Sequence, residues 1–139
     1  MTDPDLTSAP SQVRALVSAL SVDGFTVVAE QGGGAVNRVL ELAGPRCSVR
    51  VTADRGQWRL DLGRPPEVDW YDTDVWTACL DGRSTGSEAS SLHEQVDFVV
   101  RRWADVAAAG PDVTDRLAGE QASRARERLG LPPLIVEGN

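Results

Sequence analysis

The sequence predicts a single α+β domain, with an N-terminal helix, a five-stranded antiparallel meander sheet, and two C-terminal helices that cover one sheet face. Three observations indicate this fold class. Apolar residues recur at helical spacing near both ends of the chain, and apolar and polar residues alternate between them. The turns between the alternating segments are short, which favours antiparallel neighbours. Polar residues at every second strand position indicate that one sheet face meets water.

The N-terminal helix is predicted to begin at Pro10 and Ser11 and to end at the turn formed by Asp23 and Gly24. Its apolar residues recur three and four positions apart, which places them on one helix face. These residues are Val13, Leu16, Val17 and Leu20. We expect residues 1–10 to form a flexible tail in front of one folded domain, 11–130.

Four strands are predicted between this helix and residue 63. Residues 25–29 are rich in β-branched and aromatic side chains, and the glycines at 32–34 permit a reversal into a second strand at 39–42. The clearest alternation runs through 47–52 and resumes through 58–62 after a short turn. These last two segments are predicted to form a hairpin.

A fifth strand is predicted at 75–80, followed by a polar loop at 83–90. Ser91 and Glu94 have the spacing of a capping box, which satisfies free backbone N–H groups at the start of a helix. We expect this helix to continue to residue 109 and to be the main core-facing helix. Its apolar residues are Leu92, Val96, Val99, Trp103 and Val106.

The last helix is predicted to be capped by Asp112 or Thr114 and to reach about Leu129. Its apolar stripe is thin, which predicts a peripheral position. The stripe consists of Val113, Leu117, Ala122, Ala125 and Leu129. Residues 131–139 are expected to form a C-terminal tail, whose apolar residues 134–136 either dock in a groove or add an edge strand.

The formal net charge of −7 and the pI of about 4.6 describe an acidic chain. Nucleic acids and anionic membrane surfaces require a basic patch, so we expect neither as a partner. The N-terminus lacks the basic start and apolar run of a secretory signal, and no apolar run approaches the roughly 18 residues that span a bilayer. We therefore expect a cytoplasmic protein in which Cys47 and Cys79 are buried thiols.

The sequence contains no strong catalytic or metal-binding pattern. His93 is the only histidine, and we expect it at the surface of a helix start instead of beside a nucleophile. Cys47, Cys79 and His93 come from separate elements, without the close paired spacing of a zinc site. The carboxylates within 69–74 lack the glycine and terminal glutamate of a calcium-binding loop. We therefore expect no catalytic residues, no bound metal and no cofactor.

The stretch 67–81 combines negative charge with aromatic residues and contains no arginine. Tryptophan and tyrosine provide large, rigid contact area, and acidic neighbours attract a basic partner. Two interpretations remain open: a partner-binding surface, or a stretch in which Trp76 packs in the core and the carboxylates are only solvated. The predicted partner-binding residues are Glu67, Asp69, Trp70, Tyr71, Asp72, Asp74 and Trp76.

The leading hypothesis is a small acidic intracellular domain that neutralises or escorts a basic partner protein. The predicted element order and charge resemble those of secretion chaperones and of bacterial immunity proteins, which is a likeness of shape and charge. The alternative is a small-molecule-binding protein or an enzyme, with a site between sheet and helices that uses Arg50, Arg59 or Asp61. A third hypothesis is a homodimer, in which the last helix and residues 134–136 dock on a second copy.

Overall fold

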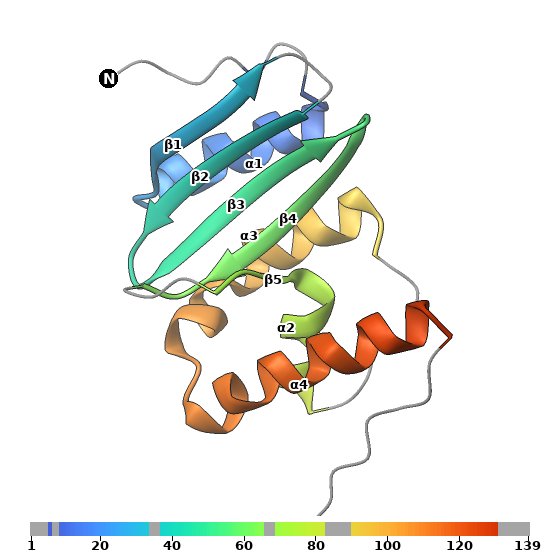
Figure 1. Ribbon diagram of the computed structural model, residues 1–139. Helices are drawn as coiled ribbons and strands as arrows, with labels where there is room; N and C mark the ends of the chain where they lie inside the picture. The colour runs from blue at the N-terminus through green and yellow to red at the C-terminus, as the bar shows by residue number, and fades with distance from the viewer. Residues whose placement is uncertain (1–5, 7–8, 34–36, 66–68, 83–89, 131–139) are drawn as a thin grey trace, which may run out of the picture.

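Four helices and a five-stranded sheet make up the part of the chain that the computed structural model describes, residues 6, 9–33, 37–65, 69–82 and 90–130 (Figure 1). The elements are α1 (Ser11–Val22), β1 (Thr26–Gly33), β2 (Asn37–Gly44), β3 (Cys47–Asp54), β4 (Gln57–Gly63), β5 (Tyr71–Asp72), α2 (Thr73–Asp81), α3 (Leu92–Ala108) and α4 (Pro111–Arg128). The strands lie in chain order, and each neighbouring pair is antiparallel. The predicted α+β fold with an antiparallel meander is confirmed, although three helices follow the sheet instead of two.

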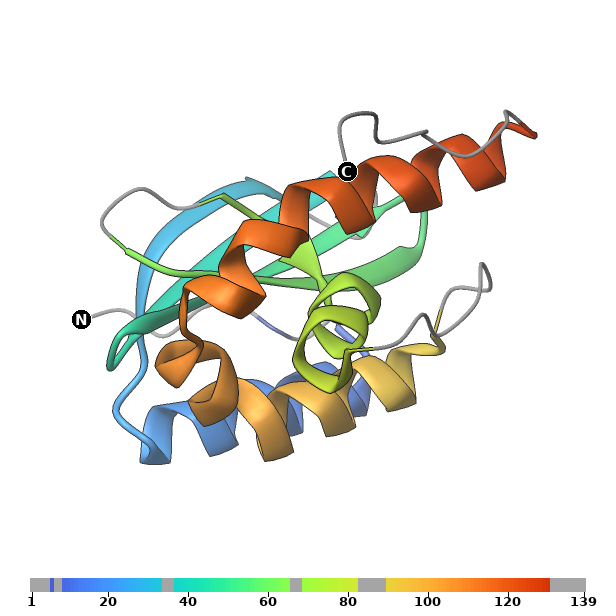
Figure 2. The same ribbon diagram turned by 90° about the horizontal axis from the view of Figure 1, so that it is seen from below.

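The helices are distributed unequally about the sheet. Helices α1 and α3 run side by side behind the sheet in Figure 1 and form one layer in Figure 2. Helix α4 lies beyond the β4–β5 edge, level with the other face, and α2 lies between α3 and α4 (Figure 2). Within the described residues, the face of β1–β4 that points away from α1 and α3 is therefore uncovered (Figure 1).

The core lies between the sheet and the layer formed by α1 and α3. Alternate strand residues point into it, as the sequence patterns of 47–52 and 58–62 predict. Each fully buried valine or leucine stabilises the fold by about 1.5–3 kcal/mol, so this layer is the main source of stability. The side chains that are at most 2% exposed include Val13, Leu16, Leu20, Leu40, Leu42, Val49, Val51, Leu60, Leu62 and Val99.

The segment 75–80, which the sequence predicts as the fifth strand, is instead part of helix α2. Asp72 caps this helix, because its carboxylate accepts a hydrogen bond from the N–H of Val75 at 2.9 Å. Gly82 ends the helix in the left-handed conformation, with a φ of 69°. A short apolar run fits both a strand and a buried helix turn, and here the capping residues decide between them. The fifth strand is the two-residue segment Tyr71–Asp72.

Helix α3 begins with the predicted capping box. The Ser91 hydroxyl accepts a hydrogen bond from the N–H of Glu94 at 3.2 Å, and the Glu94 carboxylate accepts one from the N–H of Ser91 at 3.1 Å. Phe98, Val99, Val106 and Ala107 are the buried residues of this helix. The prediction of a core-facing helix is therefore confirmed.

Helix α4 begins earlier than the sequence predicts. Its N-cap is Gly110 and a proline occupies the first helical position, so the predicted cap at Asp112 or Thr114 is wrong. Of the predicted apolar stripe only Leu117 is buried, which confirms the peripheral position. Arg124, a charged residue, is only 2% exposed and faces α2.

Several predictions fall outside the described residues, namely those for Glu67, for most of the loop 83–90 and for the tail 131–139. Of the predicted N-terminal tail, Leu6 and Ala9 are described and pack against the core. The N–H of Ala9 donates a hydrogen bond to the carbonyl of Leu6 at 3.0 Å. None of the described helices has the length and apolar character needed to cross a membrane.

Candidate functional site

Trp76, one of the predicted partner-binding residues, lies in the core and is 1% exposed. Its indole N–H donates a hydrogen bond to the Leu62 carbonyl at 3.0 Å, and its ring meets that of Tyr71 edge to face, with 6.4 Å between centroids. These contacts fix helix α2 against the end of β4. Trp76 is thus a core residue, as the second of the two interpretations of this stretch predicts, and it is not accessible to a partner.

Asp74 and Asp72 hold the N-terminal turn of α2 in place. The Asp74 carboxylate is buried and accepts hydrogen bonds from the Ser90 hydroxyl and from the Ser90 N–H, the latter at 3.0 Å. Arg124 of α4 lies 3.9 Å from Asp74, and Arg128 lies 3.9 Å from Asp72. Both aspartates therefore link α2 to its neighbours, in addition to the capping role of Asp72.

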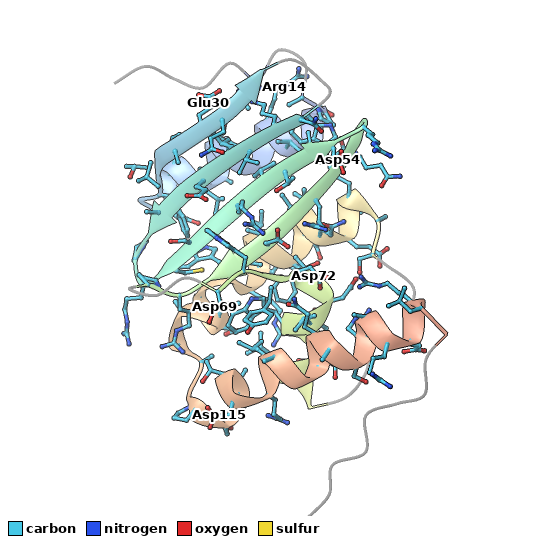
Figure 3. The ribbon with its side chains drawn as sticks, viewed as in Figure 1. Arg14, Glu30, Asp54, Asp69, Asp72 and Asp115 are labelled. Carbon is cyan, nitrogen blue, oxygen red and sulfur yellow. The ribbon has the colours of Figure 1, made fainter. Side chains whose placement is uncertain are left out.

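The acidic character of the stretch 67–81 is largely offset in three dimensions. Besides Asp72 and Asp74, Asp81 is paired as well, because the guanidinium of Arg102 lies 2.9 Å from its carboxylate. The arginines come from α3 and α4, so their proximity is not visible in the local sequence. Figure 3 shows Glu30, Asp54, Asp69 and Asp115 at separate places on the molecule, so these four carboxylates do not lie in one cluster.

Of the predicted site residues that the structure describes, Asp69 is the exposed one, and Trp70, Tyr71 and Asp72 are half-buried. The guanidinium carbon of Arg50 lies 4.9 Å from the ring centroid of Trp70. This is the geometry of a cation–π contact. Arg50 in turn donates to the Asp61 carboxylate, at 3.0 Å from Nη2 and 3.3 Å from Nε. Trp70 is therefore held by a three-residue stack, which we name the Trp70 stack after Trp70, Arg50 and Asp61.

Asp61, the innermost residue of the Trp70 stack, has a buried carboxylate. The Asp61 side chain is 5% exposed, and Arg59 lies 3.7 Å from its second oxygen. A buried carboxylate is stable only where cations and hydrogen bonds compensate its desolvation. Two arginines on adjacent strands provide this compensation, which also restricts the motion of Arg50 under the tryptophan ring.

The alternative hypothesis names Arg50, Arg59 and Asp61 and places the site between sheet and helices. The structure brings these three side chains together, but on the sheet face that points away from α1 and α3: Arg50 pairs with Asp61 across β3 and β4. The layer between sheet and helices is occupied by the apolar core side chains. The polar groups and the predicted interior site are thus on opposite faces of the sheet.

Both cysteines are buried free thiols, as predicted. Burial raises the pKa of Cys47 to about 12, and a weaker attraction to Arg64 acts in the opposite direction. Burial also raises the pKa of Cys79. Since the thiolate is the nucleophilic form, neither side chain is activated for covalent chemistry. Cys79 lies in helix α2, because the strand predicted around it is wrong.

One surface cleft of about 530 Å³ lies between α2 and the start of α3. It contains His93, which is exposed in the first turn of α3 as predicted, and also Asp74 and Asp97. The Asp74 carboxylate accepts a hydrogen bond from the Ser90 N–H, and the Asp97 carboxylate lies 3.5 Å from the guanidinium of Arg101. Both of these carboxylates therefore already have partners. Among the described residues, no group of three or more His, Cys, Asp or Glu side chains has an arrangement that could hold a metal ion.

The chain matches no protein-family model, no curated protein and no solved structure.

Proposed function

We propose that this chain is a protein-binding domain that neutralises or escorts another protein, and that the partner contacts the uncovered sheet face around Trp70. The observation that carries this proposal is the Trp70 stack, in which Arg50 bridges an accessible tryptophan and a buried aspartate. A side chain that is already held in one orientation loses little conformational entropy on binding. Tryptophan and arginine are also the residues that most often dominate protein interfaces.

The charge of the chain supports a basic partner through its long-range effect. The net charge is −7, and an opposite charge on the partner accelerates association in a salt-dependent manner. Local attraction is weaker than the sequence of 67–81 indicates, because arginines of α3 and α4 pair with three of its carboxylates. We therefore expect salt to change the association rate more than the dissociation rate.

Affinity capture of the tagged chain from its native cells, at low and high salt, tests this function. Mass spectrometry of the retained proteins identifies the partner, and titration with the purified partner then gives the affinity. We expect Trp70→Ala to weaken binding about tenfold to thirtyfold, as for a central interface tryptophan. Arg50→Ala should weaken binding less, because the indole remains but loses its support.

Val22→Ala is the matched control, since Val22 is 87% exposed at the end of α1, in the layer on the other side of the sheet. It should leave the affinity unchanged, and thermal unfolding should show that all three variants are folded. If Trp70→Ala binds like the wild type, the partner uses another surface. Recovery of the chain without any protein partner contradicts the proposed function itself.

A further inference from the structure

The outer edge of β4 is only partly covered by β5. Their pairing is confined to Asp61 with Asp72 and Leu62 with Tyr71, so residues 57–60 have no strand partner on this side within the described part of the chain. We call this segment the β4 edge. Unpaired strand edges bind other strands readily, and proteins usually cover or blunt them.

Among the described residues, the side chain of Gln95 contacts the β4 edge where a neighbouring strand would pair. The N–H of Leu60 donates a hydrogen bond to the side-chain oxygen of Gln95 at 2.9 Å, and the Gln95 amide nitrogen donates to the Ser90 carbonyl at 3.0 Å. The Gln95 amide thus accepts on one side and donates on the other, as a backbone peptide group of an adjacent strand does. Since backbone polar groups of alternate strand residues point the same way, those of Trp58 point to the same edge.

A surface cleft of about 430 Å³ lies beside the β4 edge. Trp58 and Leu92 are its apolar residues, and both are half-buried. Arg59 also borders the cleft and is on the opposite strand face from Trp58, with its side chain 60% exposed. A strand added to this edge would therefore place the side chains on one of its faces against Trp58 and Leu92, and those on its other face near Arg59.

We propose that the β4 edge and this cleft bind an extended segment of the partner protein as an added β-strand, in exchange for the Gln95 amide. The segment carries an apolar residue against Trp58 and Leu92 and an acidic residue opposite Arg59, because side chains alternate between the two faces of a strand and opposite charges pair across strands. This inference rests on the proposed function, in that the ligand is a protein segment. The contact between this acidic residue and Arg59 acts only at short range, because salt screens charges that are farther apart. The partner protein as a whole can therefore still be basic.

The two edges of the sheet differ in a way that favours this site. Strand β1, at the other edge, has an irregular register between Val27 and Ala29 and directs Glu30 toward Arg38, which is 6% exposed. A bulge and an inward-pointing charge oppose strand addition permanently. Gln95, by contrast, is a side chain, so its rotation away from the β4 edge breaks two hydrogen bonds, and an added strand replaces the one from the Leu60 N–H.

A phage-displayed library of random peptides, panned against the whole chain, tests the proposal. We expect selected peptides to alternate apolar and acidic residues and to lose binding when alternate backbone amides are N-methylated. Gln95→Ala should tighten their binding about threefold to tenfold, because one competing hydrogen-bonded group is removed. Trp58→Ala should weaken it about tenfold or more. In amide exchange, Leu60 of Gln95→Ala should lose protection and regain it when the peptide is added.

Gln12→Ala, at an exposed position on α1, is the matched control and should leave peptide binding unchanged. If no peptide is selected on either wild type or Gln95→Ala, the β4 edge is not a binding site. The same conclusion follows if the selected peptides bind Gln95→Ala and Trp58→Ala like the wild type. Those results leave capture of a partner through Trp70 intact, whereas loss of all protein partners in the capture experiment contradicts the proposed function.

Discussion

Arg124 of α4 places its Nη2 atom 3.9 Å from Oδ2 of Asp74 in α2, and both side chains are buried. The same arginine lies 3.8 Å from Glu120, one helical turn earlier. A buried charged residue of α4 thus contacts α2, and Leu117 is the other buried residue of α4. Buried charges of this kind are costly unless they are compensated, so removal of one partner should be strongly destabilising.

We predict that Asp74→Ala lowers the free energy of unfolding by about 2–4 kcal/mol. The substitution removes the acceptor for two hydrogen bonds from Ser90. It also leaves the buried Arg124 without the carboxylate of Asp74, so that Glu120 is its remaining acidic neighbour among the ion pairs given above. Urea-induced unfolding, followed by circular dichroism, measures the change. Asp97→Ala is the matched control: its exposed pair with Arg101 contributes at most about 1 kcal/mol. Equal stability losses in the two variants contradict the prediction.

Local sequence patterns predict the first four strands and three of the four helices, because alternation marks β3 and β4, apolar stripes mark α1 and α3, and glycine and proline mark the ends of the elements. Helix α2 is the exception. Its apolar residues fit both patterns, and Asp72 could be recognised as a cap only if the helix were considered first. The sequence already contains that signal, since a capping aspartate precedes and a left-handed glycine follows the segment.

The candidate site was less accessible to sequence reasoning, for a different physical reason. The arginine that supports Trp70 is on β3, and the arginines that pair with Asp72 and Asp74 are on α4. Contacts between residues so far apart in the chain depend on the packing of whole elements. Local charge counts therefore overstate the acidity of the folded surface.

The hydrogen bond from Trp76 to the Leu62 carbonyl gives a second stability prediction. Trp76→Phe removes the donor and part of the ring from a fully packed site, so we expect unfolding to require about 1–3 kcal/mol less. Chemical denaturation monitored by circular dichroism tests this value. Trp58→Phe is the control, because Trp58 is only half-buried, and it should cost less than about 1 kcal/mol. A larger loss for Trp58→Phe than for Trp76→Phe would show that the two indoles have been assigned the wrong roles.

The buried thiol of Cys47 predicts a specific loss of stability in alkali. Burial raises its pKa from 9.0 to about 12, so between these values the unfolded chain loses a proton that the folded chain retains. Stability is therefore fully present below pH 9 and falls as the pH rises toward 12, by at most about 1.4 kcal/mol per pH unit. Urea unfolding at a series of pH values, compared between wild type and Cys47→Ala, isolates this contribution from that of Tyr71, whose pKa is also raised by burial. The decline should be shallower in Cys47→Ala, and parallel pH profiles would mean that the thiol is not the group responsible.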